Sequence, residues 1–163
     1  MLITRLAKIV MCLGLGLCCL LVAFDNVTDY ATNYLFVQHV LSMDTTSPGN
    51  GLMYRSITSP IVWRLVYAAI IAAEAVTGIL FVAGAVALWR ARLAPAATFN
   101  HAKGYAIAAA ALAFVIWFFG FMVVGGEWFA MWESQTWNGQ QAAFRFYMAA
   151  LAVLILLNQP DPD

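Results

Sequence analysis

Residues 65–89 read LVYAAIIAAEAVTGILFVAGAVALW, a run of 25 residues with a single charge, Glu74. About 20 mostly apolar residues suffice for an α-helix to cross the hydrocarbon core of a bilayer. The run therefore predicts a membrane-spanning helix that holds a carboxyl group far from either aqueous face. An ionisable group at that depth is costly, and it normally marks a pairing partner or a functional site.

The composition of the whole chain also predicts a membrane protein. Hydrophobic residues make up 64% of the sequence and charged residues 10%, and the mean hydropathy is +0.82. These values lie outside the range of soluble domains. The net charge is zero and no basic stripe is present, so nothing predicts binding to nucleic acid. The 163 residues leave room for one domain.

Four apolar runs predict four spanning helices, at about residues 7–27, 60–90, 104–126 and 138–158. The predicted fold is an all-α membrane protein, a four-transmembrane-helix bundle. Ser59 before Pro60 predicts the N-cap of the second span. Small residues at four-residue spacing predict close helix contacts in lipid; these are Ala68 and Ala72, Ala69 and Ala73, Ala106 and Ala110, and Ala109 and Ala113.

Two helices are expected outside the spans. Tyr30, Tyr34, Val37 and Leu41 recur at helical spacing, which predicts an amphipathic helix in the first outer loop. Residues 127–137 carry three tryptophans, which are typical of the membrane interface and predict a short interfacial helix before the fourth span. Asn138 and Gln141 resemble a capping box that opens the fourth helix. The tail at residues 158–163 is too short and too rich in proline to fold by itself.

An even number of spans places both ends of the chain on one side of the membrane. Arg5 and Lys8 precede the first span, and Arg90, Arg92 and Lys103 lie in the short second connection. Because positive residues favour the cytoplasmic side, both termini are expected in the cytoplasm. No small-x-small cleavage site follows the first apolar run, so an uncleaved signal anchor is expected there.

The first and fourth apolar runs are short, so the polar residues at their outer ends are expected to enter the bundle. They predict a polar cavity in its outer half, formed by Asp25, Asn26, Asp29, Asn33, His39, Glu74, Glu127, Gln140, Gln141 and Arg145. Counting along the helices puts Glu74 and Arg145 at similar depths, which predicts an ion pair. A protonated Glu74 hydrogen-bonded to Tyr67 or Thr77, or a relay of protons or cations, is the alternative.

No residue pattern predicts catalysis or a bound cofactor. Asp25, Asp29 and Asn33 form a stripe of oxygen ligands, but helix capping or partnership with an arginine explains them more simply, and no metal site is expected. His39 and His101 fall on opposite sides of the membrane, so they cannot ligate one haem in a single chain. No known catalytic motif is present, and no enzyme activity is expected.

Several short motifs carry a resemblance to a known family. They are DNVTDY at residues 25–30, FVQHV at 36–40, GGEWF at 125–129 and WNGQQ at 137–141. With them, nearly the whole chain resembles a bacterial family of predicted small integral membrane proteins, classed as a domain of unknown function. The resemblance implies four spans and a location in the bacterial cytoplasmic (inner) membrane. It implies no activity, cofactor or catalytic residue.

We expect a non-enzymatic accessory or binding component of that membrane, in contact with lipid and with a larger membrane-protein complex or further copies of itself. The first alternative is a small transporter or ion-coupled carrier that uses Glu74, Asp25, Asp29 and Arg145. A weaker alternative is a redox subunit that binds a lipid, a quinone or a haem.

Overall fold

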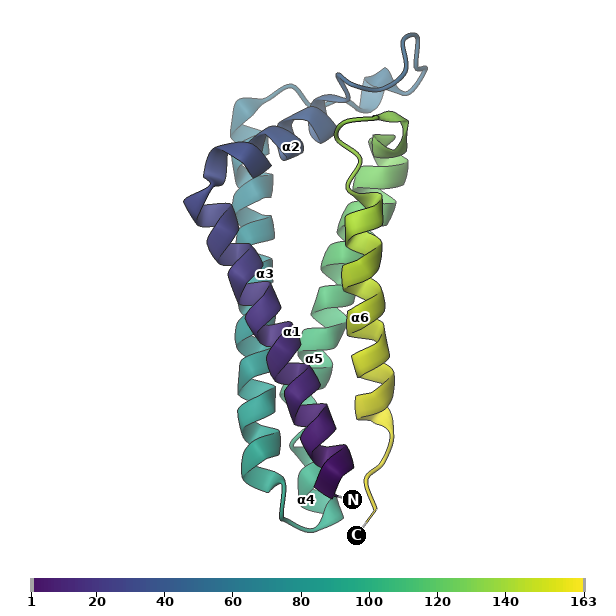
Figure 1. Ribbon diagram of the computed structural model, residues 1–163. Helices are drawn as coiled ribbons and strands as arrows, with labels where there is room; N and C mark the ends of the chain where they lie inside the picture. Colours follow the sequence, from purple (N-terminus) through teal and green to yellow (C-terminus); the bar gives the residue numbers. More distant parts are fainter. Residues whose placement is uncertain (1, 163) are drawn as a thin grey trace.

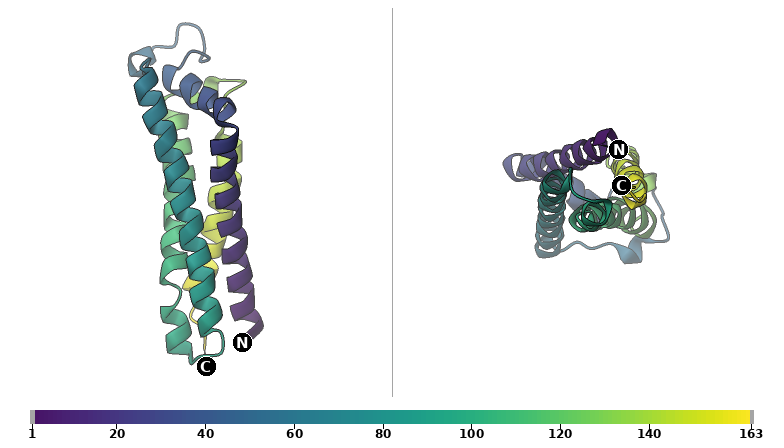
Figure 2. Two further views of the ribbon diagram at one scale, coloured as in Figure 1. Left: turned by 90° about the vertical axis from the view of Figure 1, so that its left-hand side faces the viewer. Right: turned by 90° about the horizontal axis from the view of Figure 1, so that it is seen from below.

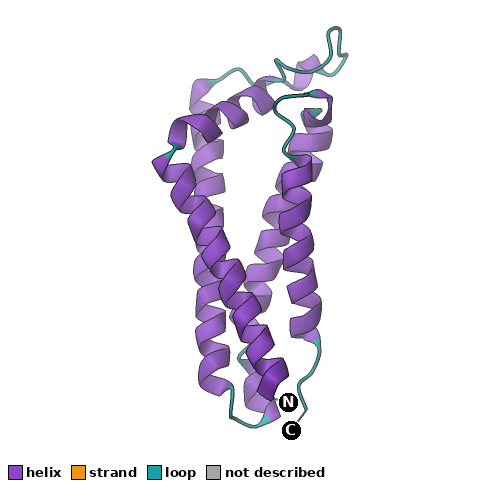
Figure 3. Cartoon of the chain, in the orientation of Figure 1, coloured by secondary structure: helices purple, strands orange, loops and turns teal. Residues whose placement is uncertain are grey.

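The computed structural model describes residues 2–162, and in this part of the chain helices are joined by loops, with no strand (Figure 3). Four helical segments are long and apolar enough to cross a membrane. They are α1 (Leu2–Thr28), α3 (Pro60–Ala91), a third segment made of α4 (Ala96–His101), α5 (Gly104–Phe114) and η2 (Val115–Trp128), and α6 (Gln140–Asn158). The predicted all-α membrane bundle is therefore confirmed.

The helices run lengthwise, and both ends of the chain lie at the same end of the bundle (Figure 1). We call this the termini end. The other end is crossed by α2 (Tyr30–Ser42), which we call the α2 end. There, α3 and the outer part of α1 lie on one side and η2 and α6 on the other, with α2 bridging them (Figures 1 and 2). The spans thus diverge from the termini end towards the α2 end.

Glycines set the closest helix contacts. A Cβ on Gly78 of α3 would lie 2.7 Å from Leu20 Cγ of α1, and one on Gly16 of α1 would lie 2.9 Å from Val82 Cγ2. A Cβ on Gly84 would lie 2.7 Å from the backbone nitrogen of Ala106 on α5. Helices in lipid gain from backbone approach and van der Waals contact, so α1, α3 and α5 pack through these glycines.

The predicted alanine contacts are right for one helix and wrong for the other. On α5 the four alanines are buried, at residues 106, 109, 110 and 113. On α3, Ala68, Ala69 and Ala72 are exposed and Ala73 is half-buried. The small residues that α3 buries are Gly78, Gly84, Ala85 and Ala91, which lie nearer the termini end than the predicted pairs.

The helices outside the spans agree with the sequence. The predicted amphipathic helix is α2, which buries Val37, Val40 and Leu41. Ser59 is the N-cap of α3, although its side chain makes no capping hydrogen bond. The short interfacial helix is η3 (Met131–Glu133).

The predicted capping box before the fourth span was wrong. Gly139 is the N-cap of α6, and Asn138 Oδ1 instead accepts a hydrogen bond from the Gln140 nitrogen at 3.1 Å. The Asn138 side chain thus forms a local turn with the backbone two residues on, and it is not available to cap the helix. The fourth helix consequently begins two residues later than predicted.

The half of the third span nearer the α2 end is a π-helix of 14 residues, η2. Its last hydrogen bond runs from the Phe129 nitrogen to the Val124 oxygen at 3.1 Å, five residues back. A π-helix is rare and usually lasts one turn, and it frequently occurs at functional sites. Nothing in this largely apolar sequence predicts the wider geometry.

Buried charges close the termini end. Lys8 Nζ lies 2.5 Å from Asp161 Oδ2, and Lys103 Nζ lies 2.6 Å from the same oxygen. Both ammonium groups also donate to the backbone oxygen of Gln159, at 3.0 and 2.8 Å. We call these three side chains the Lys8–Lys103–Asp161 triad, and all three are buried. The tail, which the sequence predicts to be unfolded, therefore docks on the bundle, because its carboxylate neutralises two buried cations.

Arg5 reinforces this closure. Its guanidinium donates to the carbonyl oxygens of Arg92 at 3.1 Å and Ala94 at 2.7 Å, and it lies over the Phe99 ring at 4.7 Å from the ring centre. The loop between α3 and α4 is thereby joined to the start of α1. The end of the bundle where the chain begins and ends is thus held by charge-assisted hydrogen bonds.

Candidate functional site

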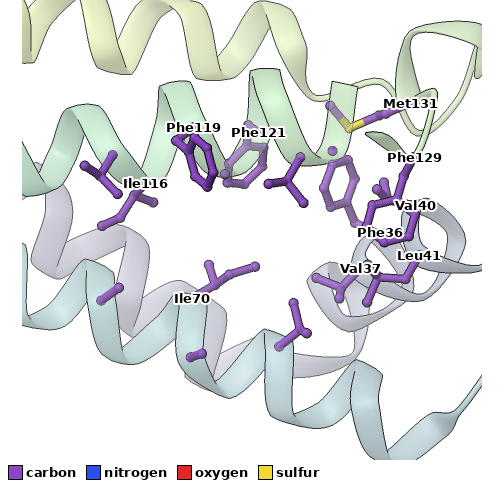
Figure 4. Close-up of a pocket in the computed structure, with 17 residues that line it drawn as sticks. Phe36, Val37, Val40, Leu41, Ile70, Ile116, Phe119, Phe121, Phe129 and Met131 are labelled. Carbon is purple, nitrogen blue, oxygen red and sulfur yellow. The ribbon is translucent and has the colours of Figure 1, made fainter. Parts of the chain in front are cut away.

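An apolar cavity of about 400 Å³ lies beneath α2, between α3 and η2. Figure 4 shows Ile116, Phe119 and Phe121 on one wall and Ile70 on the opposite wall, with α2 residues closing one end. All the described residues that line it are apolar or glycine. The cavity therefore offers van der Waals contact without hydrogen bonds from side chains.

The cavity opens sideways between α3 and η2. Four of its lining residues are exposed: Ala69 on α3, and Val115, Phe119 and Gly120 on η2. Val115 is 52% exposed and Phe119 55%. These residues belong to helical segments long and apolar enough to span a membrane, so the opening lies between two candidate spans.

A second cavity, of about 230 Å³, lies among α1, α2, α3, η2 and α6. Its polar lining consists of Asn26, Asn33 and Glu74, and most of the remaining lining is apolar or aromatic. The two cavities share four lining residues, Phe36, Val37, Ile70 and Phe121. We call them the apolar cavity and the Glu74 cavity; they meet at these shared side chains.

Glu74 is held by an amide. The residue is 2% exposed, and its Oε2 accepts a hydrogen bond from Asn26 Nδ2 at 2.7 Å. Tyr67 donates its hydroxyl proton to the backbone oxygen of Asn26 at 2.9 Å. That carbonyl lies in the last turn of α1, where no later helical N–H reaches it, so the tyrosine satisfies an otherwise unpaired group. These contacts fasten the outer end of α1 to α3.

The predicted ion pair between Glu74 and Arg145 was wrong. Within residues 2–162, Glu74 forms no ion pair, and Arg145 is exposed on the outer face of α6. The buried face of α6 carries Ala143, Tyr147 and Ala150. Equal depth along two helices does not fix how each helix is rotated, and α6 turns Arg145 away from the bundle.

The alternative partners named for Glu74 were also wrong. Thr77 donates to the backbone oxygen of Ala73 at 2.7 Å, and Tyr67 reaches Glu74 only through Asn26. The sequence placed Asn26 in the cavity but did not identify it as the partner of Glu74. The only sequence feature that pointed to this contact was the position of Asn26 near the end of the first span.

The predicted polar cavity contains three of its ten residues, Asn26, Asn33 and Glu74. The other seven lie elsewhere, because most of them sit on helix faces or loops that point away from the bundle. Asp25, Asp29, Glu127, Gln141 and Arg145 are exposed, and Gln140 and His39 are half-buried outside the lining. The observed cavity is consequently far more apolar than the predicted one.

Asp29 and His39 have local partners. Asp29 Oδ1 accepts from Thr32 Oγ1 at 2.9 Å, one turn along the chain. His39 Nδ1 lies 2.9 Å from Asp44 and its ring stacks on Trp137 at 4.7 Å. No group of three His, Cys, Asp or Glu residues suited to a metal ion occurs in the described part of the chain.

These features define a class, the small polytopic integral membrane proteins, with four apolar spans and an interior cavity. The chain belongs to the family of predicted small integral membrane proteins known as DUF2165, whose sequence profile matches residues 4–160. The comparisons with curated proteins and with solved structures found no match.

Proposed function

We propose that this protein is a non-enzymatic binding component of the membrane that holds a lipophilic molecule under α2. The observation that carries the proposal is the apolar cavity of about 400 Å³ with a lateral opening between two spans. Cavities of about 300–1,000 Å³ are typical of small-molecule sites. A ligand dissolved in the bilayer reaches such an opening without crossing water.

The chemistry of the lining supports binding over catalysis. The apolar cavity supplies contact surface alone, and the carboxyl of the neighbouring Glu74 cavity already accepts a hydrogen bond from Asn26. Such a site selects a molecule by shape and by one polar end. The ligand would be an amphipathic membrane molecule with its chain in the apolar cavity.

The location that we propose is the bacterial cytoplasmic membrane, with the termini end on the cytoplasmic side. Five basic residues support this orientation: Arg5, Lys8, Arg90, Arg92 and Lys103. Three basic residues, Arg55, Arg64 and Arg145, belong to the other end. The excess of positive charge is expected on the cytoplasmic side. An accessory role beside a larger complex, or in a homo-oligomer, is part of the same proposal.

Two variants of α3 test whether the cavity binds a ligand. Ala69 and Ala68 are neighbours, both exposed, and only Ala69 lines the apolar cavity. We expect wild type purified in mild detergent to carry a stoichiometric lipophilic molecule, detected by native mass spectrometry. Ala69→Trp should lose that molecule because the indole fills the opening, and Ala68→Trp should retain it. Equal retention in both variants, or an empty wild type, would contradict the proposal.

The runner-up is an ion-coupled carrier, and the buried Glu74 beside a cavity favours it. In that case proteoliposomes should show a proton flux that Glu74→Gln abolishes and that Glu127→Gln, at an exposed carboxyl, leaves unchanged. Absence of flux in wild type would remove this alternative.

A further inference from the structure

We propose that the ligand carries an ammonium group and that Glu74 is its counter-ion. This inference rests on the proposed function, since it names the chemical class of the molecule that the two cavities hold. The binding site is the Glu74 cavity, and the ligand class is an alkylammonium.

The first observation is a buried carboxyl that lacks a cation. Glu74 is 2% exposed and accepts a hydrogen bond from the neutral amide of Asn26, and no Lys, Arg or His forms an ion pair with it in residues 2–162. A charged group in the interior of a membrane protein is normally paired or lines a cavity. Glu74 lines a cavity, so a cation in that space would complete its pairing.

The second observation is the aromatic wall of the same cavity. Tyr67, Trp117, Phe121 and Phe146 line it together with Glu74. Trp117 and Phe146 stack with ring centres 4.8 Å apart, which fixes their orientation. The faces of aromatic rings attract ammonium groups, most strongly where water is excluded. An anionic ligand would be repelled by the carboxylate, and a purely apolar one would leave it unpaired.

The third observation is the relation of the two cavities. Phe36 and Phe121 line both, with ring centres 6.0 Å apart. The two cavities therefore adjoin at these rings, and in the proposed complex the head group lies in the Glu74 cavity while its alkyl chain passes the rings to lie beneath α2. The smaller cavity, about 230 Å³, suits an ammonium, and the larger one, about 400 Å³, suits its alkyl chain.

The test uses two probes that differ in their head group, dodecylamine and dodecanol, with purified protein in mild detergent at pH 7. Binding is measured by isothermal titration calorimetry. We expect wild type to bind the amine at least about ten-fold more tightly than the alcohol, since ten-fold corresponds to about 1.4 kcal/mol and a hydrogen bond to a charged group contributes at least that much. Glu74→Gln should remove most of the preference by weakening the amine alone, since only the contribution of the aromatic wall remains.

Two further variants keep the test decisive. Glu127→Gln removes an exposed carboxyl that lies outside the Glu74 cavity, and it should preserve the preference. Phe146→Leu keeps an apolar side chain in the lining but removes an aromatic face, so it should weaken the amine several-fold and leave the alcohol unchanged. This second variant also provides an answer if Glu74→Gln fails to fold.

The possible failures are distinguishable. If both probes bind wild type equally, or if the preference for the amine survives in Glu74→Gln and Phe146→Leu, the ammonium inference is overturned while ligand binding stands. If neither probe binds wild type, the proposed function itself fails.

Discussion

The two ends of the bundle treat buried charge in opposite ways. At the termini end, Asp161 neutralises Lys8 and Lys103 at distances of 2.5 and 2.6 Å. Nearer the α2 end, along α3, Glu74 has an amide for a partner and an open space beside it. The first arrangement completes its charges within the chain and closes the bundle. The second leaves a carboxyl beside a cavity, and this difference separates a structural cluster from a candidate binding site.

Helix packing shows the same division. Gly84 brings α3 against Ala106 of α5, so that a Cβ there would meet backbone. Nearer the α2 end, α3 and η2 separate and the apolar cavity lies between them. One long helix is therefore tightly packed along one part of its length and lines an opening along another.

The largest expected effect is on the tightly packed part. Gly84→Leu should prevent folding, because overpacking costs about 1–3 kcal/mol where neighbours can move, and the backbone of Ala106 cannot. Gly14→Leu is the matched control, since a Cβ at Gly14 has no atom within 4 Å. The yield of monodisperse protein in detergent measures the difference. Equal yields for the two variants would show that the close contact is dispensable.

The second effect concerns the Lys8–Lys103–Asp161 triad. Asp161→Asn leaves two buried ammonium groups without a counter-ion, and we expect a loss of about 3–5 kcal/mol in the free energy of unfolding. Asp44→Asn, at an exposed carboxyl paired with His39, should cost about 1 kcal/mol or less. Thermal unfolding in detergent compares them. Similar losses of unfolding free energy in both variants would show that the buried triad contributes no more to stability than an exposed ion pair.

Acidification should reach the triad in a defined range. Burial alone would raise the pKa of the Asp161 carboxyl, but the hydrogen bonds and charges of Lys103 and Lys8 outweigh it, and the pKa lies below its ordinary value of 3.8. A carboxyl whose pKa is lower in the folded state stabilises fully above pH 3.8, and this contribution is lost as the pH falls through the folded pKa. The difference in melting temperature between wild type and Asp161→Asn should stay constant from that pH up to neutral pH and shrink below it. If wild type and Asp161→Asn already melt at the same temperature at neutral pH, Asp161 is not the group whose titration controls this stability.

A smaller effect is expected at the α2 end. Glu74→Gln retains an oxygen that accepts from Asn26, so the free energy of unfolding should change by about 1.5 kcal/mol or less. Glu74→Leu removes the acceptor and leaves the Asn26 amide unpaired, which should cost about 1–3 kcal/mol. Unfolding of the two variants under identical detergent conditions tests this order. The reverse order would mean that the hydrogen bond is not formed.

The smallest effect is expected at Arg145. This side chain is exposed on α6, so Arg145→Gln should change stability by about 0.5 kcal/mol or less. A double-mutant cycle with Glu74→Gln should be additive, because the two side chains share no contact. Non-additivity would restore the ion pair that the structure excludes.

The sequence predicted those parts of the fold that depend on neighbouring residues. The four spans follow from the length and apolarity of continuous runs, and α2 follows from the spacing of Tyr30, Tyr34, Val37 and Leu41. Ser59 and Pro60 likewise mark the beginning of α3. Each of these signals is local, so one sequence is enough to interpret it.

The parts that it did not predict depend on contacts between distant residues. Depth along a helix said nothing of rotation about its axis, which is why Arg145 was misplaced and Asn26 was not recognised as the partner of Glu74. Docking of the tail needs Asp161 to meet a lysine 153 positions earlier. The apolar lining under α2 arises because three separate segments converge, and no single run reveals it.

The π-helix also decides the rotational phase of the residues at its far end. Each residue turns an α-helix by about 100°, since a turn takes 3.6 residues. Removing one residue from Val115–Trp128 would relax the segment towards α geometry and swing its outer turn around. Gly126, which now lies against Gln140, would then be turned away from it. The contact at the start of α6 thus depends on the π-helical winding of η2.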